Sequence, residues 1–184
     1  MRIAAISGSL RAGSHNGELL RAAAAAAPAG VEVVLYEGLK EVPPYDADDD
    51  VPGDQPLAVA RLKAALADAD AVLVATPEYN HSIPGVLKNA LDWVSRPLAE
   101  SPVRGKPTAV LTASTGIFGG VWAAAETRKV LGALGATVLE DTVALAKSHE
   151  RLEGGADAEL EAELRAVLGS LVAAAAAERE RAAA

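Results

Sequence analysis

The segment 71–95 constrains the fold more than any other part of the chain. Residues 71–75, Ala-Val-Leu-Val-Ala, form a short apolar run rich in β-branched residues, which is typical of a buried strand. After Gly85 the apolar residues recur with helical spacing. Pro84 suits the first turn of a helix, and Ser82 is expected to cap that helix. The segment therefore predicts a strand, a polar loop and a helix.

The same alternation of apolar run and helical segment occurs five times along the chain. It predicts the α/β class: a doubly wound, five-stranded parallel sheet between two layers of helices. We expect the strand order 2-1-3-4-5, which places a ligand crevice between strands 1 and 3. The expected strands are 2–7, 31–36, 71–75, 108–112 and a segment within 137–145, and the expected helices are about 17–27, 56–69, 86–95, 121–134 and 157–177.

Length and composition limit the class of protein. The 184 residues, 51% of them hydrophobic, predict one globular domain over 1–177, with residues 178–184 as a frayed tail. No apolar run reaches the ~18–20 residues of a membrane span. The chain has no cysteine and three histidines without ligand spacing, so we expect no disulfide and no metal site. A net charge of −8 disfavours binding to nucleic acid or to anionic membranes. We expect a cytoplasmic protein.

The loop after the first expected strand combines hydroxyl, guanidinium and amide groups. Ser9, Arg11, Ser14 and Asn16 all precede or begin the first helix. Backbone N–H groups and the positive end of the helix dipole suit a phosphate at this position, and a guanidinium adds a charge-assisted hydrogen bond. The alternative is a serine-rich turn that only caps the helix.

Two common phosphate motifs do not fit this loop. Gly8 and Gly13 have the spacing of a P-loop, but Ser14-His15 follows instead of Lys-Ser/Thr. The dinucleotide pattern Gly-x-Gly-x-x-Gly is also absent after the first strand. A phosphoacceptor domain would need acidic residues there, where Ser7-Gly8-Ser9 stands. A terminal monophosphate remains the best ligand for this loop.

The loops after the third and fourth strands suit a flat ring. Residues 77–80, Pro-Glu-Tyr-Asn, offer an aromatic face, and residues 114–120 contain three glycines that permit close approach of the backbone. Tyr79, Phe118 and Trp122 lie at or beside these loops, and their coincidence at one edge of the sheet favours a flat apolar ligand. A phosphate site and a ring site at one sheet edge together match the shape of FMN.

Two separated motifs resemble those of the NADPH-dependent FMN reductases, a flavodoxin-like family that includes quinone, azo-dye and chromate reductases. The first motif is Gly8-Ser-Leu-Arg11 with Ser14-x-Asn16. The second is Pro77-Glu-Tyr-Asn80-x-Ser82-x-Pro84-Gly-x-Leu87-Lys-Asn89-Ala-x-Asp92-Trp93. The resemblance extends from Met1 to about Val143 and departs from the usual pattern at Thr115 and at Val121-Trp122, which affects the substrate side.

The resemblance implies bound FMN, a flavin-dependent oxidoreductase that uses NADPH or NADH, and a small acceptor such as a quinone. It implies a homodimer, with a homotetramer as the alternative, and flavin near the subunit boundary. Because the cofactor carries the chemistry, no catalytic side chain is assigned. The implied phosphate ligands are Ser9, Arg11, Ser14 and Asn16, the residues bordering the ring are Pro77, Glu78, Tyr79 and Asn80, and Ser114, Gly116 and Gly119 close the site.

Several alternatives stay open. The chain could be an FMN-binding electron carrier, or a flavin reductase that supplies reduced FMN to a partner monooxygenase. Glu78 is more readily explained by loop ordering than by general-base catalysis, and His15 and His81 by packing or hydrogen bonding. Trp93 lies at the margin of its helix's apolar stripe, so a place at the core edge and a place in a subunit interface are equally compatible with the pattern.

Overall fold

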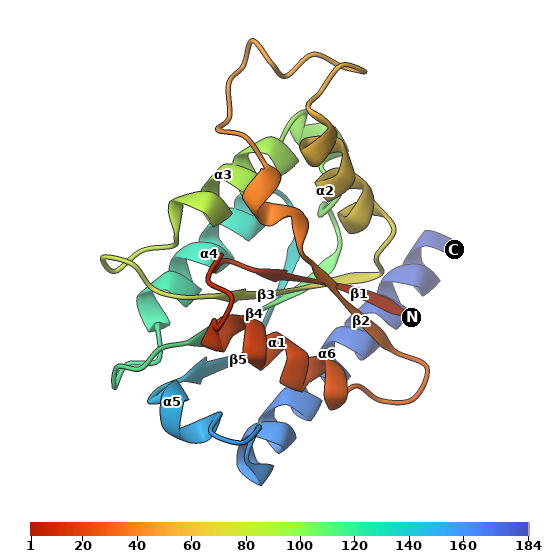
Figure 1. The fold of residues 1–184 in the computed structure, drawn as a ribbon. Coiled ribbons are helices and arrows are strands. Elements are labelled where there is room, and N and C mark those ends of the chain that lie inside the picture. Colours follow the sequence, from red (N-terminus) through yellow and green to blue (C-terminus); the bar gives the residue numbers. More distant parts are fainter. Residues whose placement is uncertain (184) are drawn as a thin grey trace.

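A computed structural model describes residues 1–183 as one parallel sheet covered by helices on both faces (Figure 1). The strand order is β2-β1-β3-β4-β5, which confirms the predicted doubly wound, flavodoxin-like topology. Each strand pairs in parallel with its neighbour, for example Ile6 with Val74 between β1 and β3. The strands are β1 (Arg2–Ser7), β2 (Glu32–Tyr36), β3 (Ala71–Thr76), β4 (Pro107–Ala113) and β5 (Thr137–Leu145).

The helices form two layers, as Figure 1 shows. α1 and α6 pack against each other and cover one face of the sheet, while α2, α3 and α4 cover the other face. The helices are α1 (His15–Ala25), α2 (Leu57–Ala67), α3 (Gly85–Val94), α4 (Val121–Ala133), the short α5 (Ser148–Arg151) and α6 (Ala158–Ala183), and two 3₁₀ segments span Gly38–Glu41 and Leu98–Glu100. Among residues 1–183, no helix combines the length and the hydrophobicity needed to cross a membrane.

The core is aliphatic and lies on both sides of the sheet. Every residue of β3 and β4 is buried, as expected for central strands covered by helices on both faces. Trp93 is the large exception to the aliphatic core. Its ring is fully buried, its Nε1 donates to the carbonyl of Pro43 at 2.9 Å, and Tyr45 packs edge-on against it at 4.9 Å. Trp93 is therefore a core residue of this chain and does not reach the surface.

Two expectations about helix ends were wrong. Ser82 does not cap α3, because Pro84 occupies the cap position without a side-chain bond and the Ser82 hydroxyl instead bonds the carboxylate of Glu126. The last helix does not end near residue 177, since α6 continues to Ala183. Arg179 in this last part pairs with Asp70, which precedes β3, at 2.6 Å. That ion pair gives the end of α6 a contact with the body of the protein, a contact that the sequence pattern alone did not reveal.

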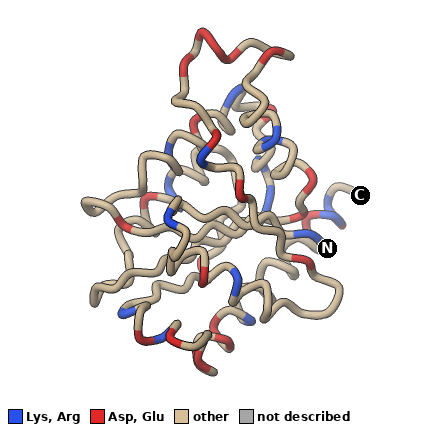
Figure 2. The backbone as a smooth tube through the Cα atoms, in the orientation of Figure 1, with Lys and Arg blue, Asp and Glu red and all other residues tan. Residues whose placement is uncertain are grey.

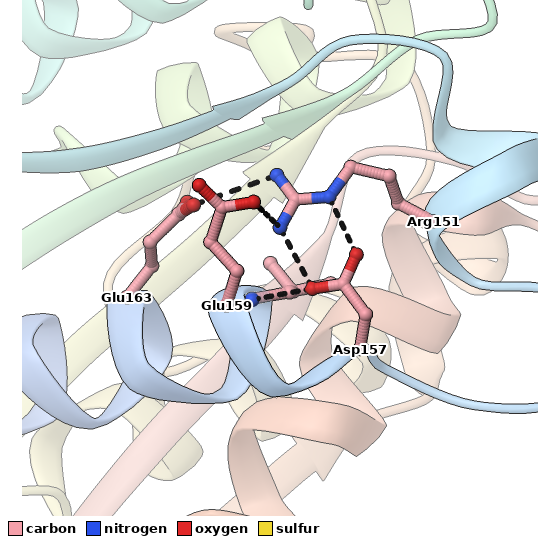
Figure 3. A network of polar contacts seen from close by, with 5 residues as sticks. Arg151, Asp157, Glu159 and Glu163 are labelled. Carbon is pink, nitrogen blue, oxygen red and sulfur yellow. Dashed lines mark hydrogen bonds and ion pairs between the residues drawn. The ribbon is translucent and has the colours of Figure 1, made fainter.

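A carboxylate and an arginine fasten the start of α6 (Figure 3). Asp157 accepts a hydrogen bond from the Leu160 N–H at 2.7 Å, as a helix cap does. The Arg151 guanidinium bonds both oxygens of Asp157 at 2.8 Å, and it also pairs with Glu159 and Glu163. The hydrogen bonds from Arg151 and from the Leu160 N–H hold the pKa of Asp157 well below its usual range.

Polar groups also close the amino ends of the strands. The Lys106 ammonium donates to the carbonyls of Leu66, Ala67 and Ala69 at 2.5–2.7 Å, and thus satisfies the last turn of α2 and the residues after it. Burial lowers the pKa of Lys106, an effect that the nearby acidic side chains oppose. Asp70 accepts from the Arg2 N–H at 2.7 Å and pairs with Arg179 as described above.

Acidic side chains gather in one projecting loop, and the rest of the charge is mixed (Figure 2). The loop follows the first 3₁₀ segment and contains Asp46, Asp48, Asp49, Asp50 and Asp54. It projects at the top of Figures 1 and 2, away from the loops that follow β1, β3 and β4.

Candidate functional site

Three loops meet at the carboxyl ends of β1, β3 and β4, at the left of Figure 1, and surround a cavity of about 220 Å³. The parallel order of the strands brings these loops together, because it puts all carboxyl ends at one edge of the sheet. The cavity is lined by Ser9, Arg11, Ser14, His15, Asn16, Pro77, Glu78, Tyr79, Ala113, Ser114 and Thr115. The sequence predicted eight of these eleven residues as cofactor-binding residues.

The β1–α1 loop presents donors at the start of a helix. Ser14 is the N-cap of α1, and its hydroxyl accepts from the Gly17 N–H at 3.4 Å. The N–H groups of His15 and Asn16 have no acceptor within residues 1–183. The Arg11 side chain likewise makes no hydrogen bond or ion pair within the described chain, and it is exposed. Free amides at a helix N-terminus beside a free guanidinium are the donors that a phosphate requires.

Asn16 has a structural role as well as a place in the cavity wall. Its Nδ2 donates to the Ala113 carbonyl at 3.0 Å, and its Oδ1 accepts from the Ala113 N–H at 2.9 Å. The side chain is buried, so this reciprocal pair joins the start of α1 to the end of β4 away from water. One N–H of the amide remains for a ligand.

The β3–α3 loop is a tight hairpin turn. Tyr79 and Ser82 exchange backbone hydrogen bonds at 2.9 and 3.0 Å, and the two residues between them have positive φ, 53° for Asn80 and 61° for His81. Positive φ at both central positions is what a type I′ turn requires, and asparagine tolerates it better than most residues. Asn80 is exposed and does not line the cavity, so the turn geometry alone accounts for it.

Glu78 connects this turn to α4. One carboxylate oxygen, Oε2, accepts from the N–H groups of Trp122 and Ala123 at 3.1 and 3.2 Å. The other, Oε1, lies 3.5 Å from Nδ1 of His81. The Glu78 side chain is only 14% exposed, and one of its oxygens already accepts two hydrogen bonds within the chain. A carboxylate held in this way orders the loop, which agrees with the structural interpretation of Glu78 rather than with a general base.

The β4–α4 loop packs against β5. The Ser114 hydroxyl accepts from the Gly116 N–H at 3.1 Å, and the Gly116 carbonyl accepts from the Lys147 N–H at 3.0 Å. Gly119 has φ of 64°, and a Cβ there would lie 2.5 Å from the Ala144 carbonyl oxygen, so only glycine fits. Ser114 lines the cavity, whereas Gly116 and Gly119 do not. The two glycines shape the loop rather than the cavity wall.

Apolar side chains crowd the surface beside the cavity. Phe118 and Trp122 pack edge-on at 5.1 Å, and His81 packs against Trp122 at 4.9 Å. This apolar patch comprises Tyr79, Ile117, Phe118, Val121 and Trp122, each of them 42–71% exposed. The sequence predicted three aromatic residues at this edge of the sheet, and the structure confirms their position.

Three cavity residues were not among the predicted site residues. Ala113 and Thr115 flank the predicted Ser114. The backbone of Ala113 is hydrogen-bonded to the Asn16 side chain, which also lines the cavity. His15 was expected near the site in a packing or hydrogen-bonding role, and its Nδ1 lies 2.7 Å from Oγ of the buried Ser148. The spacing of Ser14-x-Asn16 contained the only signal for His15, because the intervening residue begins the same helix.

Comparison with known proteins supports a family assignment. A family model described as NADPH-dependent FMN reductase matches residues 1–150. A protein named quinone reductase from Escherichia coli (strain K12) is 40% identical over 139 residues, which are 76% of this chain and 73% of that protein. An NAD(P)H-dependent FMN reductase from Pseudomonas aeruginosa is 47% identical over 119 residues, which are 65% of this chain and 63% of that protein.

A solved structure agrees with the fold over nearly the whole chain. It is FerB of Paracoccus denitrificans, described as a flavoenzyme NAD(P)H:(acceptor) oxidoreductase. The two chains superpose with a TM-score of 0.81 at 31% identity, and the match covers 97% of each. The likeness therefore includes α6, which lies beyond the residues that the family model matches.

Proposed function

The chain belongs to the NADPH-dependent FMN reductase family, and from this membership we propose that it is a quinone-type reductase that oxidises NADPH or NADH and reduces small acceptors such as quinones. It is an FMN-dependent oxidoreductase, as its family is. The cavity where the three loops meet carries the proposal, because both phosphate donors and an aromatic loop line it. The names of the quinone-reducing relatives support the acceptor class.

The residues present suit FMN. The free N–H groups of α1, the Ser9 and Ser14 hydroxyls and the Arg11 guanidinium would hold its phosphate, because all of them can donate to an anion. Pro77, Tyr79 and the backbone of residues 113–115 would border its ring. We propose the same phosphate role for the free N–H of Asn16, whereas Glu78, Asn80, Gly116 and Gly119 would shape the loops.

The protein's own contribution is positioning and access. When bound, FMN supplies the two-electron chemistry that links a nicotinamide donor to an acceptor. A volume of about 220 Å³ lies below the roughly 300–1,000 Å³ of most ligand pockets, so a mononucleotide here would keep part of its surface accessible. Such access lets donor and acceptor use the same face of the site in turn. No side-chain acid or base is required for this sequence of events.

Purified protein tests the proposal directly. We expect it to retain yellow FMN after dialysis and to consume NADPH or NADH when benzoquinone is added. An electron carrier would retain flavin without consuming the donor. A flavin reductase for a partner enzyme would lose FMN on dialysis, and its rate would saturate with added free FMN. A protein that stays colourless after incubation with excess FMN would refute the cofactor site itself.

We further propose that the protein is a homodimer and that it acts in the cytoplasm, where NAD(P)H is available. The apolar patch beside the cavity supports self-association, since a large exposed apolar patch commonly marks an interface. Light scattering after size exclusion should give twice the monomer mass of 18.7 kDa. Replacing Phe118 and Trp122 with serine should shift the mass toward the monomer, and a mass of four subunits would favour the tetramer instead.

A further inference from the structure

The first turn of α4 has no cap of its own. Its N-cap residue is Gly120, which makes no side-chain hydrogen bond, although serine, threonine, aspartate and asparagine are the usual residues at this position. Close packing explains the glycine. Gly120 has φ of 85°, and a Cβ there would lie 3.1 Å from the Thr112 Cβ of β4. Because a side chain at Gly120 would be strained, the N–H groups of Trp122 and Ala123 have no capping side chain from their own helix.

Glu78 supplies that acceptor from a different loop, 44 residues earlier in the chain. Its Oε2 accepts from the Trp122 and Ala123 N–H groups, which places a carboxylate at the positive end of the α4 dipole. Two further contacts join the same two segments. The Ser82 hydroxyl bonds Glu126 one turn further along α4, and the His81 ring packs on Trp122.

These contacts make the β3–α3 turn and the start of α4 one unit. The turn is already rigid, because Tyr79 and Ser82 close it with two backbone hydrogen bonds. Pro77, Glu78 and Tyr79 line the cavity on one side, and Ala113, Ser114 and Thr115, which lead toward α4, line it on another. The bond from Glu78 to α4 therefore joins the loop that carries the first group of lining residues to the helix that follows the second group.

We propose that Glu78 is a positioning residue: by capping α4 from the β3–α3 loop, it fixes the separation of the two loops that border the FMN ring. The inference rests on the proposed cofactor site and adds to it a role that needs no contact between Glu78 and the cofactor. A ligand bound between preformed walls loses less free energy to ordering than one that must order them. Losing the cap should therefore weaken FMN binding and change the environment of the ring.

A pair of Glu78 variants separates this role from a direct one. Glu78→Ala removes the acceptor, and we expect about tenfold weaker FMN binding, within the range typical of coupled sites. The visible circular dichroism of the bound flavin should change as well. Glu78→Gln keeps a side-chain carbonyl that can accept from both N–H groups, so it should restore affinity to within about threefold of wild type and restore the flavin spectrum.

Asp157 provides a control, because its carboxylate also accepts a hydrogen bond from the first turn of a helix but does not line the cavity. Asp157→Ala should lower the melting temperature of the apoprotein, as Glu78→Ala should, without changing FMN affinity or the flavin spectrum. If Glu78→Ala affects only the melting temperature, Glu78 is merely a cap and the inference is wrong. If Glu78→Gln restores the melting temperature but binds FMN as weakly as Glu78→Ala, the cap does not set FMN affinity and the inference is equally wrong. Failure of wild-type protein to bind FMN would instead overturn the proposed function.

Discussion

Polar groups at the two ends of the sheet differ in whether they have hydrogen-bond partners within the chain. At the amino ends of the strands, the Lys106 ammonium is shared among three carbonyls, and Asp70 is bonded to Arg2 and Arg179. At the carboxyl ends, Arg11 and the first N–H groups of α1 have no partner within residues 1–183. In the folded chain, these polar groups at the amino ends of the strands are bonded internally, whereas hydrogen-bond donors at the carboxyl ends stay available for a ligand.

This difference indicates which polar residues serve stability and which serve binding. A polar group whose bonds are all internal contributes to the folded state, and its removal should appear in the melting temperature. A donor left free at a helix N-terminus contributes little until an anion arrives, and its removal should appear in ligand affinity. Asn16 belongs to both classes, because it lies at the binding end and yet bonds Ala113 with both of its amide atoms.

Asn16→Ala should therefore have the largest effect of the proposed variants. It should lower the stability of the protein although Asn16 lies at the binding end of the sheet. It leaves the buried N–H and carbonyl of Ala113 without partners, each worth about 1–3 kcal/mol, so we expect a loss of roughly 2–4 kcal/mol in the free energy of unfolding. For a chain of this length that corresponds to a melting temperature lower by roughly 4–16 °C. Urea unfolding of the apoprotein measures the loss.

Asn16→Asp refines the same test. Aspartate can still accept from the Ala113 N–H, but it cannot donate to the Ala113 carbonyl. Its second carboxylate oxygen would instead face the Ala113 carbonyl oxygen, and the two would repel each other. At neutral pH it should be no more stable than Asn16→Ala. Equal stability of wild type and both variants would mean that the reciprocal pair contributes nothing to folding.

The sequence predicted the sheet well because the signals for it are local. Apolar runs of strand length and helical periodicity repeat five times, and parallel strands admit few arrangements. The meeting of the three loops was predicted from the order of the strands, and Ser9, Arg11 and Tyr79 on these loops do line one cavity. What escaped prediction depends on partners distant in the chain: the pair between Asn16 and Ala113, and the cap that Glu78 gives to α4.

The errors have the same origin. Ser82 stands where a capping residue is common, but its backbone closes the hairpin turn with Tyr79 and its hydroxyl bonds Glu126, 44 positions later. Similarly, the apolar pattern of α6 stops near residue 177, whereas the helix continues to Ala183 and its Arg179 pairs with Asp70. No periodicity within a single helix contains this information, because both partners are contributed by other elements.

Arg11→Ala tests the binding end of the sheet and should have the second-largest effect, on FMN affinity. Hydrogen bonds to charged groups contribute about 1.5–3 kcal/mol, so FMN affinity should fall roughly tenfold to hundredfold. The melting temperature of the apoprotein should stay the same, because Arg11 has no partner within the described chain. Fluorescence titration with FMN gives the affinity. Arg11→Lys keeps the charge but loses the planar fork, and it should fall between wild type and alanine.

Arg165 offers a control of the same residue type. It pairs with Glu161 on the surface of α6 at 3.0 Å and does not line the cavity. Arg165→Ala removes one positive charge, as Arg11→Ala does, but it does so outside the cavity, so it should leave FMN affinity unchanged. Equal weakening by the two variants would reduce the role of Arg11 to general electrostatics.

Lys106→Met tests the closed end of the sheet and should affect stability alone. Methionine retains much of the apolar stem but frees the carbonyls of Leu66, Ala67 and Ala69, which lie near enough to the surface for water to replace part of the loss. We expect a loss of about 1–2 kcal/mol in the free energy of unfolding. FMN affinity, measured on protein that is fully folded at 20 °C, should match wild type. A weaker affinity would show that the two ends of the sheet are coupled.

Asp70→Asn should have the smallest effect, and the effect should depend on pH. Burial alone would raise the pKa of Asp70, but the hydrogen bonds from Arg179 and from the Arg2 N–H outweigh burial, and the pKa lies below its ordinary value. A carboxyl group whose pKa is lower in the folded state stabilises the fold above its unfolded pKa of about 3.9, and this contribution disappears as the pH falls through the folded pKa.

The difference in unfolding free energy between wild type and Asp70→Asn should therefore be about 0.5–1 kcal/mol at pH 7, the scale of a surface ion pair, and shrink as the pH falls below about 4. Added salt should reduce it at pH 7, because a partly exposed pair is screened. FMN affinity should be the same in both proteins at pH 7. A difference that persists unchanged at pH 2 would mean that the shape of the side chain, rather than its charge, secures the end of α6.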